Sequence, residues 1–397
     1  MKRIKVVFDA QLLFERQKTG IGWNAKKMID ELVQYPELDC TLNCFLMKDR
    51  ERTEAILKVY REQGCKVHQS RWMPARIYYH LERLLPVPYR WIFGKNDGIT
   101  QFFNYTIPFG VSGQNVTFIY DMAYMACPET MAQRTRHWLS RNMNKYCSRA
   151  SKILTISDFS RQEIHRYLDV PLEKIEVVYC GVDTEQYHPD YSEDRIQEVK
   201  AKYNIPGSYI LYLGTLEPRK NIETLIRAYQ RLLTAGPSRF GQNPSTFPKL
   251  VLAGKKGWLY DSIFQLVKEF HLENQVIFTG YVDESDAAPL LCGARMFVFP
   301  SLYEGFGIPP LEAMACGTPV IVSDCASLPE VVGDAGLLVP PMDIEKLAES
   351  MNRLLKDDQL HTALRETGLK RAGQFTWKAS AKKLVQIYRM MESNSKE

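Results

Sequence analysis

Short apolar runs alternate with longer amphipathic segments along the chain, a pattern typical of parallel strands joined by crossover helices. In the first half the runs that predict strands, with the loops after them, are Ile4–Phe8, Leu42–Met47, Lys66–His68, Asp97–Pro108, Val116–Asp121, Ile153–Ile156 and Ile175–Val178. In the second half they are Tyr209–Leu213, Lys249–Ala253, Val276–Phe278, Phe297–Phe299 and Val320–Val322. This order predicts an α/β protein built from Rossmann-like, doubly wound domains.

The length of 397 residues is enough for two domains that each have a full core. A polar segment, His188–Pro206, separates the two sets of strands and is predicted to be a linker and hinge. We therefore expect a first domain over residues 1–190 and a second over residues 205–377. The segment Ser238–Phe247 lies between two prolines and is predicted to be a surface loop.

Composition excludes several classes of protein. The net charge of +5 is too modest to indicate a nucleic-acid partner, although it allows a basic face toward anionic lipid. No apolar run approaches the length of a membrane span, and Asp9 follows the basic N-terminus too soon for a signal peptide. The nine cysteines have no metal-binding spacing, which favours reduced thiols in a cytoplasmic protein.

Two stretches are strongly basic. Residues 71–95 combine arginines with tryptophan and tyrosine, and residues 131–152 contain six basic residues and no acid. Basic amphipathic segments of this kind can lie on an anionic membrane surface, or they can be ordinary helices with one solvated basic side. The sequence leaves both interpretations open.

The most informative stretch follows the run Phe297–Phe299. The turn Glu304–Gly307 leads into a helix opened by Pro309 and Pro310, and Glu312 lies inside that helix. Glycines let the backbone approach a ligand, and amides at a helix start can donate to hydroxyls or anions. Carboxylates suit sugar hydroxyls rather than phosphate. The pattern suggests a nucleotide sugar, and a plain crossover with a surface Glu and a capping Glu is the alternative.

A second glycine loop follows the strand Tyr209–Leu213. Gly214 opens it, and Arg219 and Lys220 stand just before the helix that begins at Ile222. A strand, a glycine loop and adjacent cations at a helix start predict a diphosphate site. The alternative is a pair of solvated cations beside a turn.

The stretch GFGIPPLEAMACGTPVI, with Glu304 and Glu312 separated by seven residues, resembles the signature of the family-4 retaining glycosyltransferases, which have the GT-B fold. The resemblance covers nearly the whole chain and is weakest from about Ala10 to Phe103. It implies two Rossmann-like domains facing across a cleft, with the donor on the second domain and the acceptor on the first. It also implies that the helix 378–397 crosses back to the first domain.

The resemblance assigns donor contacts residue by residue. Glu304 would contact the transferred sugar, the amides of Gly305, Phe306 and Gly307 would bind its hydroxyls, and Glu312 would hold the ribose. Lys220 would neutralise the departing diphosphate. Thr215 stands where the family often has an arginine, and Arg219 is the expected replacement. Tyr281 lies in the loop that meets the base through backbone groups.

On the acceptor side the matches are less regular. The segment Thr19–Ala25 fits the GxGxxA pattern of a dinucleotide site, but about ten residues separate it from the preceding strand, which disfavours a dehydrogenase. The family resemblance instead makes Gly20 and Gly22 a glycine loop facing the cleft. Asn104 and Asp121 end neighbouring strands, and Asp121 is either an acceptor-binding residue or a strand-end cap. Tyr120 replaces the histidine that the family often has.

The predicted function is that of a metal-independent retaining hexosyltransferase without a cofactor, with Glu304, Asp121 and Lys220 as catalytic residues. The best match within the family is to bacterial α-mannosyltransferases that use GDP-mannose. The expected acceptor is a glycan or lipid-linked saccharide in surface polysaccharide synthesis, at the inner face of the cell membrane. The alternatives are a GT-B sugar epimerase and a non-catalytic partner subunit that binds nucleotide sugar.

Overall fold

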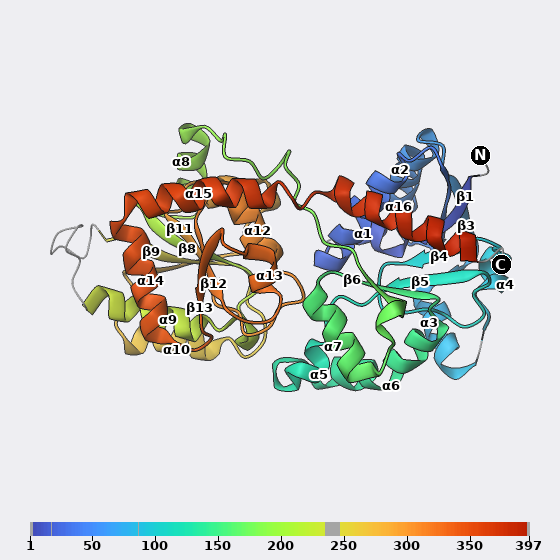
Figure 1. Ribbon diagram of the computed structural model, residues 1–397, viewed down its shortest axis with the longest axis horizontal. Helices are drawn as coiled ribbons and strands as arrows, with labels where there is room; N and C mark the ends of the chain where they lie inside the picture. Colours follow the sequence, from blue (N-terminus) through green and yellow to red (C-terminus); the bar gives the residue numbers. More distant parts are fainter. Residues whose placement is uncertain (1–2, 17, 86, 235–246, 395–397) are drawn as a thin grey trace. The chain divides into compact units, whose positions relative to one another are not determined.

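The computed structural model describes residues 3–16, 18–85, 87–234 and 247–394. The chain divides into two compact units (Figure 1). The first comprises Met1–Met125, Gln133–Gly181 and Trp377–Glu397, and the second comprises Ala126–Ala132 and Val182–Thr376. Each unit contains one parallel sheet with helices packed on both faces.

The first unit has a seven-stranded sheet in the order β3-β2-β1-β4-β5-β6-β7. Its strands are β1 (Ile4–Asp9), β2 (Leu38–Leu46), β3 (Lys66–Pro74), β4 (Ile99–Phe102), β5 (Gln114–Phe118), β6 (Lys152–Thr155) and β7 (Ile175–Val177). Its helices are α1 (Gly20–Leu32), α2 (Arg50–Glu62), α3 (Ala75–Leu84), α4 (Arg90–Phe93), α5 (Ala123–Ala126, at the border of the unit), α6 (Gln133–Arg149), α7 (Asp158–Leu168) and α16 (Trp377–Asn394). The direction of sheet growth reverses between β1 and β4.

The second unit has a six-stranded sheet in the order β10-β9-β8-β11-β12-β13. Its strands are β8 (Tyr209–Leu213), β9 (Lys249–Ala253), β10 (Val276–Gly280), β11 (Met296–Phe299), β12 (Val320–Ser323) and β13 (Gly336–Val339). Its helices are α8 (Glu193–Lys202), α9 (Ile222–Thr234), α10 (Asp261–Glu269), α11 (Glu284–Cys292), α12 (Ile308–Ala315), α13 (Leu328–Val332), α14 (Ile344–Lys356) and α15 (Asp358–Ala372). Here the reversal falls between β8 and β11, and such a reversal opens a crevice at the carboxyl ends of the two strands.

The strands read as continuous apolar runs because helices cover both faces of each sheet. Met296, Phe297, Val298 and Phe299 of β11 are all fully buried. The sequence pattern missed β13, whose four residues begin with a glycine and are mostly only partly buried. A strand this short, at the edge of the sheet, carries too little pattern to be recognised.

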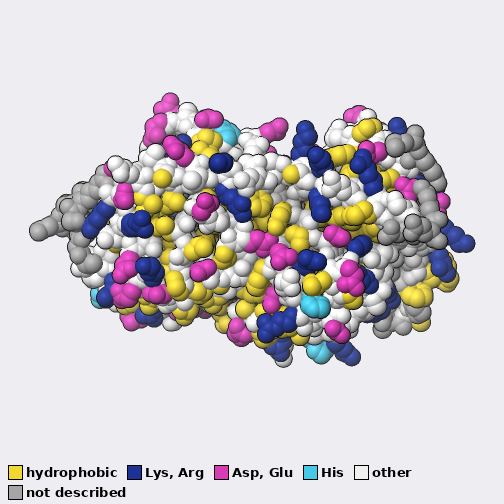
Figure 2. Space-filling view, viewed as in Figure 1, with side chains coloured by type: hydrophobic (Ala, Val, Ile, Leu, Met, Phe, Trp, Pro, Cys, Tyr) yellow, Lys and Arg dark blue, Asp and Glu magenta, His cyan; other side chains and the backbone are white. Residues whose placement is uncertain are grey.

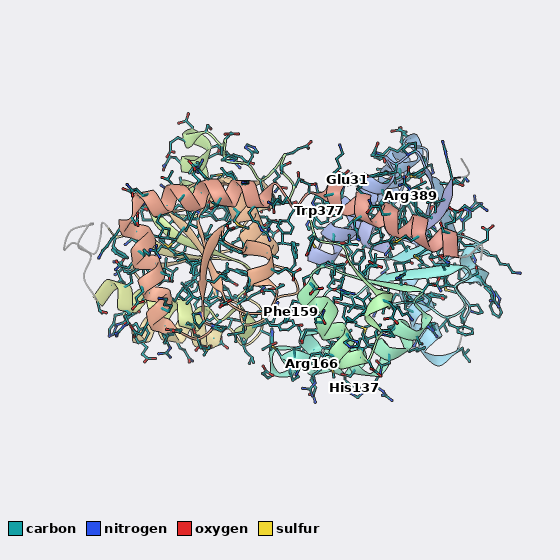
Figure 3. All side chains as sticks on the ribbon, in the orientation of Figure 1. Glu31, His137, Phe159, Arg166, Trp377 and Arg389 are labelled. Atoms are coloured by element: carbon teal, nitrogen blue, oxygen red, sulfur yellow. The ribbon has the colours of Figure 1, made fainter. Side chains whose placement is uncertain are left out.

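Helix α16 belongs to the first unit although it ends the chain. It packs against α1 and β1, and the Tyr388 hydroxyl lies 3.2 Å from Oε1 of Gln101. Figure 3 labels Trp377 at its start and Arg389 near its end, where Arg389 pairs with Glu37 at 2.5 Å. The last three residues of the predicted helix 378–397 lie outside the described residues.

The linker interpretation of His188–Pro206 is wrong. This segment contains α8, which Ser192 caps by accepting from the backbone N–H of Arg195. Arg195 and Lys202 both pair at 2.6 Å with Asp286 of α11, a nearly fully buried carboxylate. The segment is polar because it supplies these ion pairs, not because it is an extended connection.

The two basic stretches form ordinary secondary structure. Residues 71–95 contribute the end of β3, α3 and α4, while α6 buries Leu139, Met143, Tyr146 and Cys147 on one face. None of the helices in the described ranges is both long and apolar enough to cross a membrane. Most of the predicted surface loop, residues 238–246 of Ser238–Phe247, lies outside the described residues.

Asp9, at the end of β1, is a buried carboxylate. It accepts hydrogen bonds from the Tyr89 hydroxyl at 3.2 Å and the Gln11 backbone N–H at 3.5 Å. Burial raises the pKa of Asp9 from 3.8 to about 6, although both hydrogen bonds oppose the rise. The folded state therefore holds this proton more tightly than the unfolded state, and stability falls as pH rises from about 4 through about 6.

We expect Asp9→Asn to raise the free energy of unfolding at pH 8 by about 3 kcal/mol, because the pKa rises from 3.8 to about 6 and each pKa unit corresponds to roughly 1.4 kcal/mol. The gain should vanish near pH 3, below both pKa values, where the wild-type carboxyl is largely protonated in both states. Chemical denaturation at the two pH values measures it. The control is Asp97→Asn, which removes a largely exposed partner of Lys5 and should change little at either pH. An Asp9→Asn protein that is no more stable than wild type at pH 8 would contradict this account.

Candidate active site

The loop after β8 and the loop after β11 meet at the reversal point of the second sheet. The first loop makes a 3-10 turn over Pro218–Lys220, and Asn221 adopts a left-handed φ of 56° that redirects the chain into α9. The Asn221 amide donates to the Pro300 carbonyl at 3.1 Å. The backbone N–H of Leu302 donates to the Arg219 carbonyl at 2.9 Å. These bonds fasten the cation-bearing loop to the end of β11.

The loop after β11 carries the turn Glu304–Gly307. Gly307 has a φ of 117° and precedes α12, whose first turn contains Pro309 and Pro310. A Cβ at Gly307 would lie 2.8 Å from Cδ2 of Leu328, so both conformation and space require glycine there. Helix α12 ends before Gly317, which has a φ of 72°. The predicted strand, turn, helix and cap are all confirmed.

Glu304, Arg219 and Lys220 form a largely buried ion cluster. The Glu304 carboxylate lies 2.5 Å from Nζ of Lys220 and 3.1 Å from a guanidinium nitrogen of Arg219. Arg219 also pairs with Glu217 at 2.8 Å and donates to the Tyr303 carbonyl at 2.5 Å. Burial alone would raise the pKa of Glu304, but the two cations outweigh burial and hold that pKa at about 2. Glu304 is therefore ionised throughout the physiological range.

Glu312 has the opposite electrostatic environment. It lies on α12, away from the cations, and its carboxyl is hydrogen-bonded to the Tyr187 hydroxyl. Burial raises the pKa of Glu312 to about 8, and the nearby Glu284 and Asp183 add to the rise. The two carboxylates of the motif therefore have different protonation states near neutral pH, because only Glu304 has cationic partners.

The remaining predicted donor residues are positioned around these loops. The Phe306 ring is buried and packs edge-on against Phe375 at 5.7 Å, so this residue can offer a ligand only its backbone. The Thr215 carbonyl accepts from the Tyr212 hydroxyl at 3.0 Å, within the loop that contains Arg219. Tyr281 follows β10 with 62% of its surface exposed, two strands away from β8.

Sequence reasoning missed two members of this site, Glu217 and Tyr187. Glu217 lies in the same short loop as Arg219, so its charge was a visible signal that the cations have a second anionic partner. Tyr187 is far from Glu312 in the sequence and belongs to no local pattern. Only the folded chain reveals that contact.

In the first unit, Gly20 and Gly22 do not form a loop. They make the first turn of α1, where the Thr19 hydroxyl caps the helix by accepting from the Gly22 backbone N–H at 3.4 Å. The glycine-loop prediction is corrected because a capping threonine starts the helix earlier than the apolar pattern indicated.

Tyr120 is a core residue rather than an open cleft residue. Its hydroxyl donates to the Phe103 carbonyl at 2.8 Å and lies 3.3 Å from Oδ1 of Asn24, while its ring stacks on Phe118. Burial raises the pKa of Tyr120 well above its usual value. The position that follows β5 therefore offers no proton carrier here.

Asn104 and Asp121 follow the paired strands β4 and β5, so they lie at the same edge of the first sheet. Oδ1 of Asn104 accepts from the Thr106 backbone N–H at 3.1 Å, and Oδ1 of Asp121 accepts from that of Ala123 at 3.0 Å. The bond from Ala123 to Asp121 is the strand-end cap that the sequence analysis gave as the alternative for Asp121. Acceptor binding by either residue stays a prediction.

Two doubly wound units, with cations and a carboxylate at the reversal point of one sheet, define a glycosyltransferase of the GT-B class. Residues 195–371 match the family described as "Glycosyl transferases group 1", and residues 117–186 match "Glycosyltransferase Family 4". The chain belongs to the family-4 glycosyltransferases, as its sequence motif predicts.

Two relatives from Escherichia coli support this membership. O-antigen chain mannosyltransferase B of Escherichia coli is 37% identical over 277 residues, which are 70% of this chain and 70% of that protein. The serotype-specific mannosyltransferase WbdA of Escherichia coli is 34% identical over 64% of this chain. The matched part is only 31% of WbdA.

Solved structures support the fold. Sucrose-phosphate synthase from Thermosynechococcus elongatus has a TM-score of 0.70 at 20% identity, covering 99% of this chain and 100% of the other. HepE from Anabaena, in complex with UDP-glucose, has a TM-score of 0.71 at 18% identity, covering 98% and 100%. The predicted GT-B fold is thereby confirmed.

The geometry of Gly307 gives a test of the turn. We expect Gly307→Ala to lower the free energy of unfolding by about 2–4 kcal/mol, since left-handed strain and overpacking against Leu328 each cost about 1–2 kcal/mol. Gly64→Ala is the matched control, because Gly64 has a φ of 87° with open space around it and should show the strain alone. Denaturant titration compares the two, and equal losses would show that Leu328 does not constrain the turn.

Proposed function

We propose that this chain catalyses the transfer of a hexose, with retention of configuration, from a nucleoside diphosphate sugar to a saccharide acceptor. The best donor assignment is GDP-mannose. The second unit would bind the donor and the first unit the acceptor, in the synthesis of a surface polysaccharide at the inner face of the cell membrane.

The observation that carries the proposal is the cluster of Glu304, Arg219 and Lys220 at the reversal point of the second sheet. A diphosphate is a stronger ligand for these two cations than a single carboxylate, because it offers more charge and more acceptor oxygens. Donor binding would therefore draw Arg219 and Lys220 toward the phosphates. The Glu304 carboxylate would then be available to accept hydrogen bonds from sugar hydroxyls.

The same two cations would stabilise the charge that develops on the leaving diphosphate, which is the main electrostatic task of this reaction. They supply the positive charge that a divalent ion supplies in other enzymes, so we propose a metal-independent reaction. Glu312 would hold the ribose, and the loop containing Tyr281 would meet the base through its backbone. Asp121 and Asn104 would contact the acceptor.

The names of the relatives favour mannose. O-antigen chain mannosyltransferase B and WbdA are both named as mannosyltransferases, and so is the MMP alpha-(1->4)-mannosyltransferase of Mycolicibacterium hassiacum, which is 30% identical over 60% of this chain. The solved complex of HepE with UDP-glucose supports a nucleotide sugar as the donor class. We infer a GDP-linked hexose from the mannosyltransferase names.

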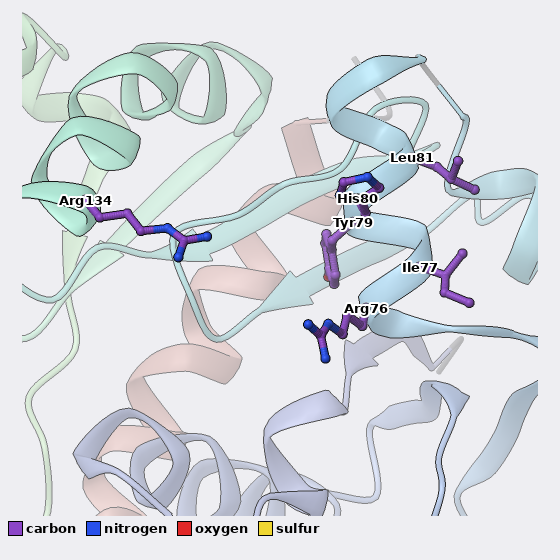
Figure 4. Close-up of a pocket in the computed structure, with 6 residues that line it drawn as sticks. All are labelled: Arg76, Ile77, Tyr79, His80, Leu81 and Arg134. Atoms are coloured by element: carbon purple, nitrogen blue, oxygen red, sulfur yellow. The ribbon is translucent and has the colours of Figure 1, made fainter.

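A basic and apolar surface of the first unit suits a lipid-linked acceptor and an anionic membrane. A hollow of about 520 Å³ between α3 and α6 is lined by Arg76, Ile77, Tyr79, His80, Leu81 and Arg134. In Figure 4 the Arg134 side chain extends from α6 toward Tyr79 and Arg76 of α3. Trp72 and Trp91 are 64% and 70% exposed. Figure 2 shows that Lys and Arg lie beside exposed apolar side chains on the displayed face of this unit.

The two alternatives differ from this proposal in measurable ways. An epimerase would convert the nucleotide sugar without any acceptor. A partner subunit would bind nucleotide sugar and transfer nothing by itself. The ionised Glu304, which lies between the cations of Arg219 and Lys220, favours an enzyme over a non-catalytic partner subunit.

We expect Glu304→Gln to lower the rate of mannose transfer by about 100-fold or more, the range seen when one electrostatic group at a reacting centre is removed. GDP affinity should stay equal or become several-fold tighter, because the variant no longer offers a charged competitor for Arg219 and Lys220. Transfer is measured with radiolabelled GDP-mannose. Binding is measured by thermal shift with GDP, UDP, ADP and dTDP, each with Mg²⁺ and with chelator.

The matched control is Glu345→Gln, since Glu345 pairs with Arg231 on the surface of the same unit. This variant should keep full transfer and unchanged GDP affinity. Unchanged transfer by the Glu304→Gln protein would overturn the catalytic assignment. A requirement for Mg²⁺ would overturn the metal-independent site, and a preference for another nucleotide would overturn GDP as the donor base.

The membrane proposal predicts binding to vesicles that contain about a third phosphatidylglycerol, weakened by salt because the attraction is electrostatic. The double variant Arg76→Glu with Arg134→Glu should lower vesicle binding at least tenfold in co-sedimentation. Both positions lie in first helical turns, where Glu is favourable, so the protein should fold.

The matched control is Lys378→Glu with Lys382→Glu, which removes two exposed cations from α16. Helix α16 packs on α1 and β1 rather than beside α3. The control should bind vesicles like wild type. Equal binding to neutral and anionic vesicles, or equal losses in the two double variants, would contradict this surface.

A further inference from the structure

A short turn after β12 packs against the turn Glu304–Gly307, which is called the donor turn below. Residues 324–327 connect β12 to α13, which begins at Leu328, and β12 pairs with β11 in the second sheet. The Cys325 thiol lies 3.4 Å from the Ser301 carbonyl and 3.3 Å from the Leu302 carbonyl. Leu328 fills the space beside Gly307. Three neighbouring residues, Cys325, Ser327 and Leu328, thus contact the loop that carries Glu304.

Ser327 makes the central contact. Its side chain is fully buried, and its hydroxyl is shared between the Glu304 carbonyl at 2.8 Å and the Phe306 carbonyl at 2.7 Å. One donor therefore anchors both peptide groups of the turn that flank Gly305 and Phe306. The preceding residue, Ala326, has a left-handed φ of 53°, a conformation that costs about 1 kcal/mol for a residue with a Cβ. This strained residue directly precedes Ser327, which contacts the donor turn.

The hydrogen bonds of Ser327 also fix the direction of the backbone N–H groups in this turn, because of the geometry of the peptide bond. In a planar trans peptide the carbonyl and the following N–H point in opposite directions. Because the carbonyls of Glu304 and Phe306 point toward Ser327, the N–H groups of Gly305 and Gly307 point away from it. These amides are two of the three that the family resemblance assigns to the hydroxyls of the transferred sugar.

We propose that Ser327 is a positioning residue for transfer: it orients the Gly305 and Gly307 amides toward the sugar of the donor. This inference rests on the proposed function. Ser327 acts through the backbone of the turn and touches neither the diphosphate nor the ribose, whose contacts come from Arg219, Lys220 and Glu312. Its loss should therefore affect sugar recognition and leave nucleotide recognition intact.

The test compares GDP and GDP-mannose on wild type and on Ser327→Ala by isothermal titration calorimetry, together with kcat and KM for transfer. We expect GDP affinity to stay within twofold of wild type. The affinity that the mannose adds beyond GDP should fall at least fivefold, and kcat should fall at least tenfold. Ser327→Thr, which keeps the hydroxyl, should recover most of both quantities.

The matched control is Ser160→Ala. Ser160 is likewise fully buried and donates its hydroxyl to a carbonyl, that of Tyr120 at 3.0 Å, in the first unit. Both alanine variants should lose similar melting temperature, and only Ser327→Ala should lose the mannose contribution.

Equal losses of GDP and GDP-mannose affinity in Ser327→Ala would show a merely structural role and overturn the inference. Unchanged binding and unchanged kcat would overturn it as well. Failure of the proposed function looks different, because wild-type protein itself would then bind neither GDP nor GDP-mannose.

Discussion

The ion cluster of Glu304 with Arg219 and Lys220 is the interaction on which the rest of the second unit depends. Charged groups with so little exposure cost several kcal/mol each in lost hydration unless they are paired. In the free protein, ion pairs offset this loss of hydration: Glu304 lies between the two cations, and Glu217 is a further anion beside Arg219. The pairing keeps the two cations in place at the reversal point, and it explains why Glu304 stays ionised although it is largely buried.

The strand order makes this cluster possible. Arg219 and Lys220 come from the loop after β8, and Glu304 comes from the loop after β11, which is far away in the sequence but adjacent in the sheet. The bonds from Asn221 to the Pro300 carbonyl and from Leu302 to the Arg219 carbonyl then fix the separation of the two loops. A sheet that grew in one direction would cover this edge with a crossover connection. The reversal leaves the edge open for a ligand.

The sequence predicts features that neighbouring residues determine, and it does not predict contacts between segments that are far apart in the chain. The turn Glu304–Gly307 and the loop before α9 were predictable because glycine, proline and charge positions define them within a few residues. The contacts of Tyr187 with Glu312 and of Ser327 with the donor turn join distant segments and leave no local pattern. Two errors were local: Thr19 caps α1 at Gly20, and Ser192 caps α8 inside the polar segment before β8. Tyr120 stands where the family often has a histidine, and its hydroxyl finds partners inside the core.

The seven-residue spacing of the two glutamates has a structural meaning. Glu304 precedes the left-handed Gly307 and stays among the cations, while Glu312 lies just over one turn along α12, which corresponds to about 6 Å of helix. The same residue type is thereby placed in two environments. Next to Lys220 and Arg219 the carboxylate remains charged, and beside Tyr187, Glu284 and Asp183 the carboxyl keeps its proton until about pH 8. In the proposed complex, a ribose that donates hydroxyl hydrogen bonds to Glu312 would favour the ionised form, whereas a diphosphate would compete with Glu304 for its cations. Under the proposed function, nucleotide binding would change the partners of both glutamates, and the first turn of α12 would set how far apart these two events occur.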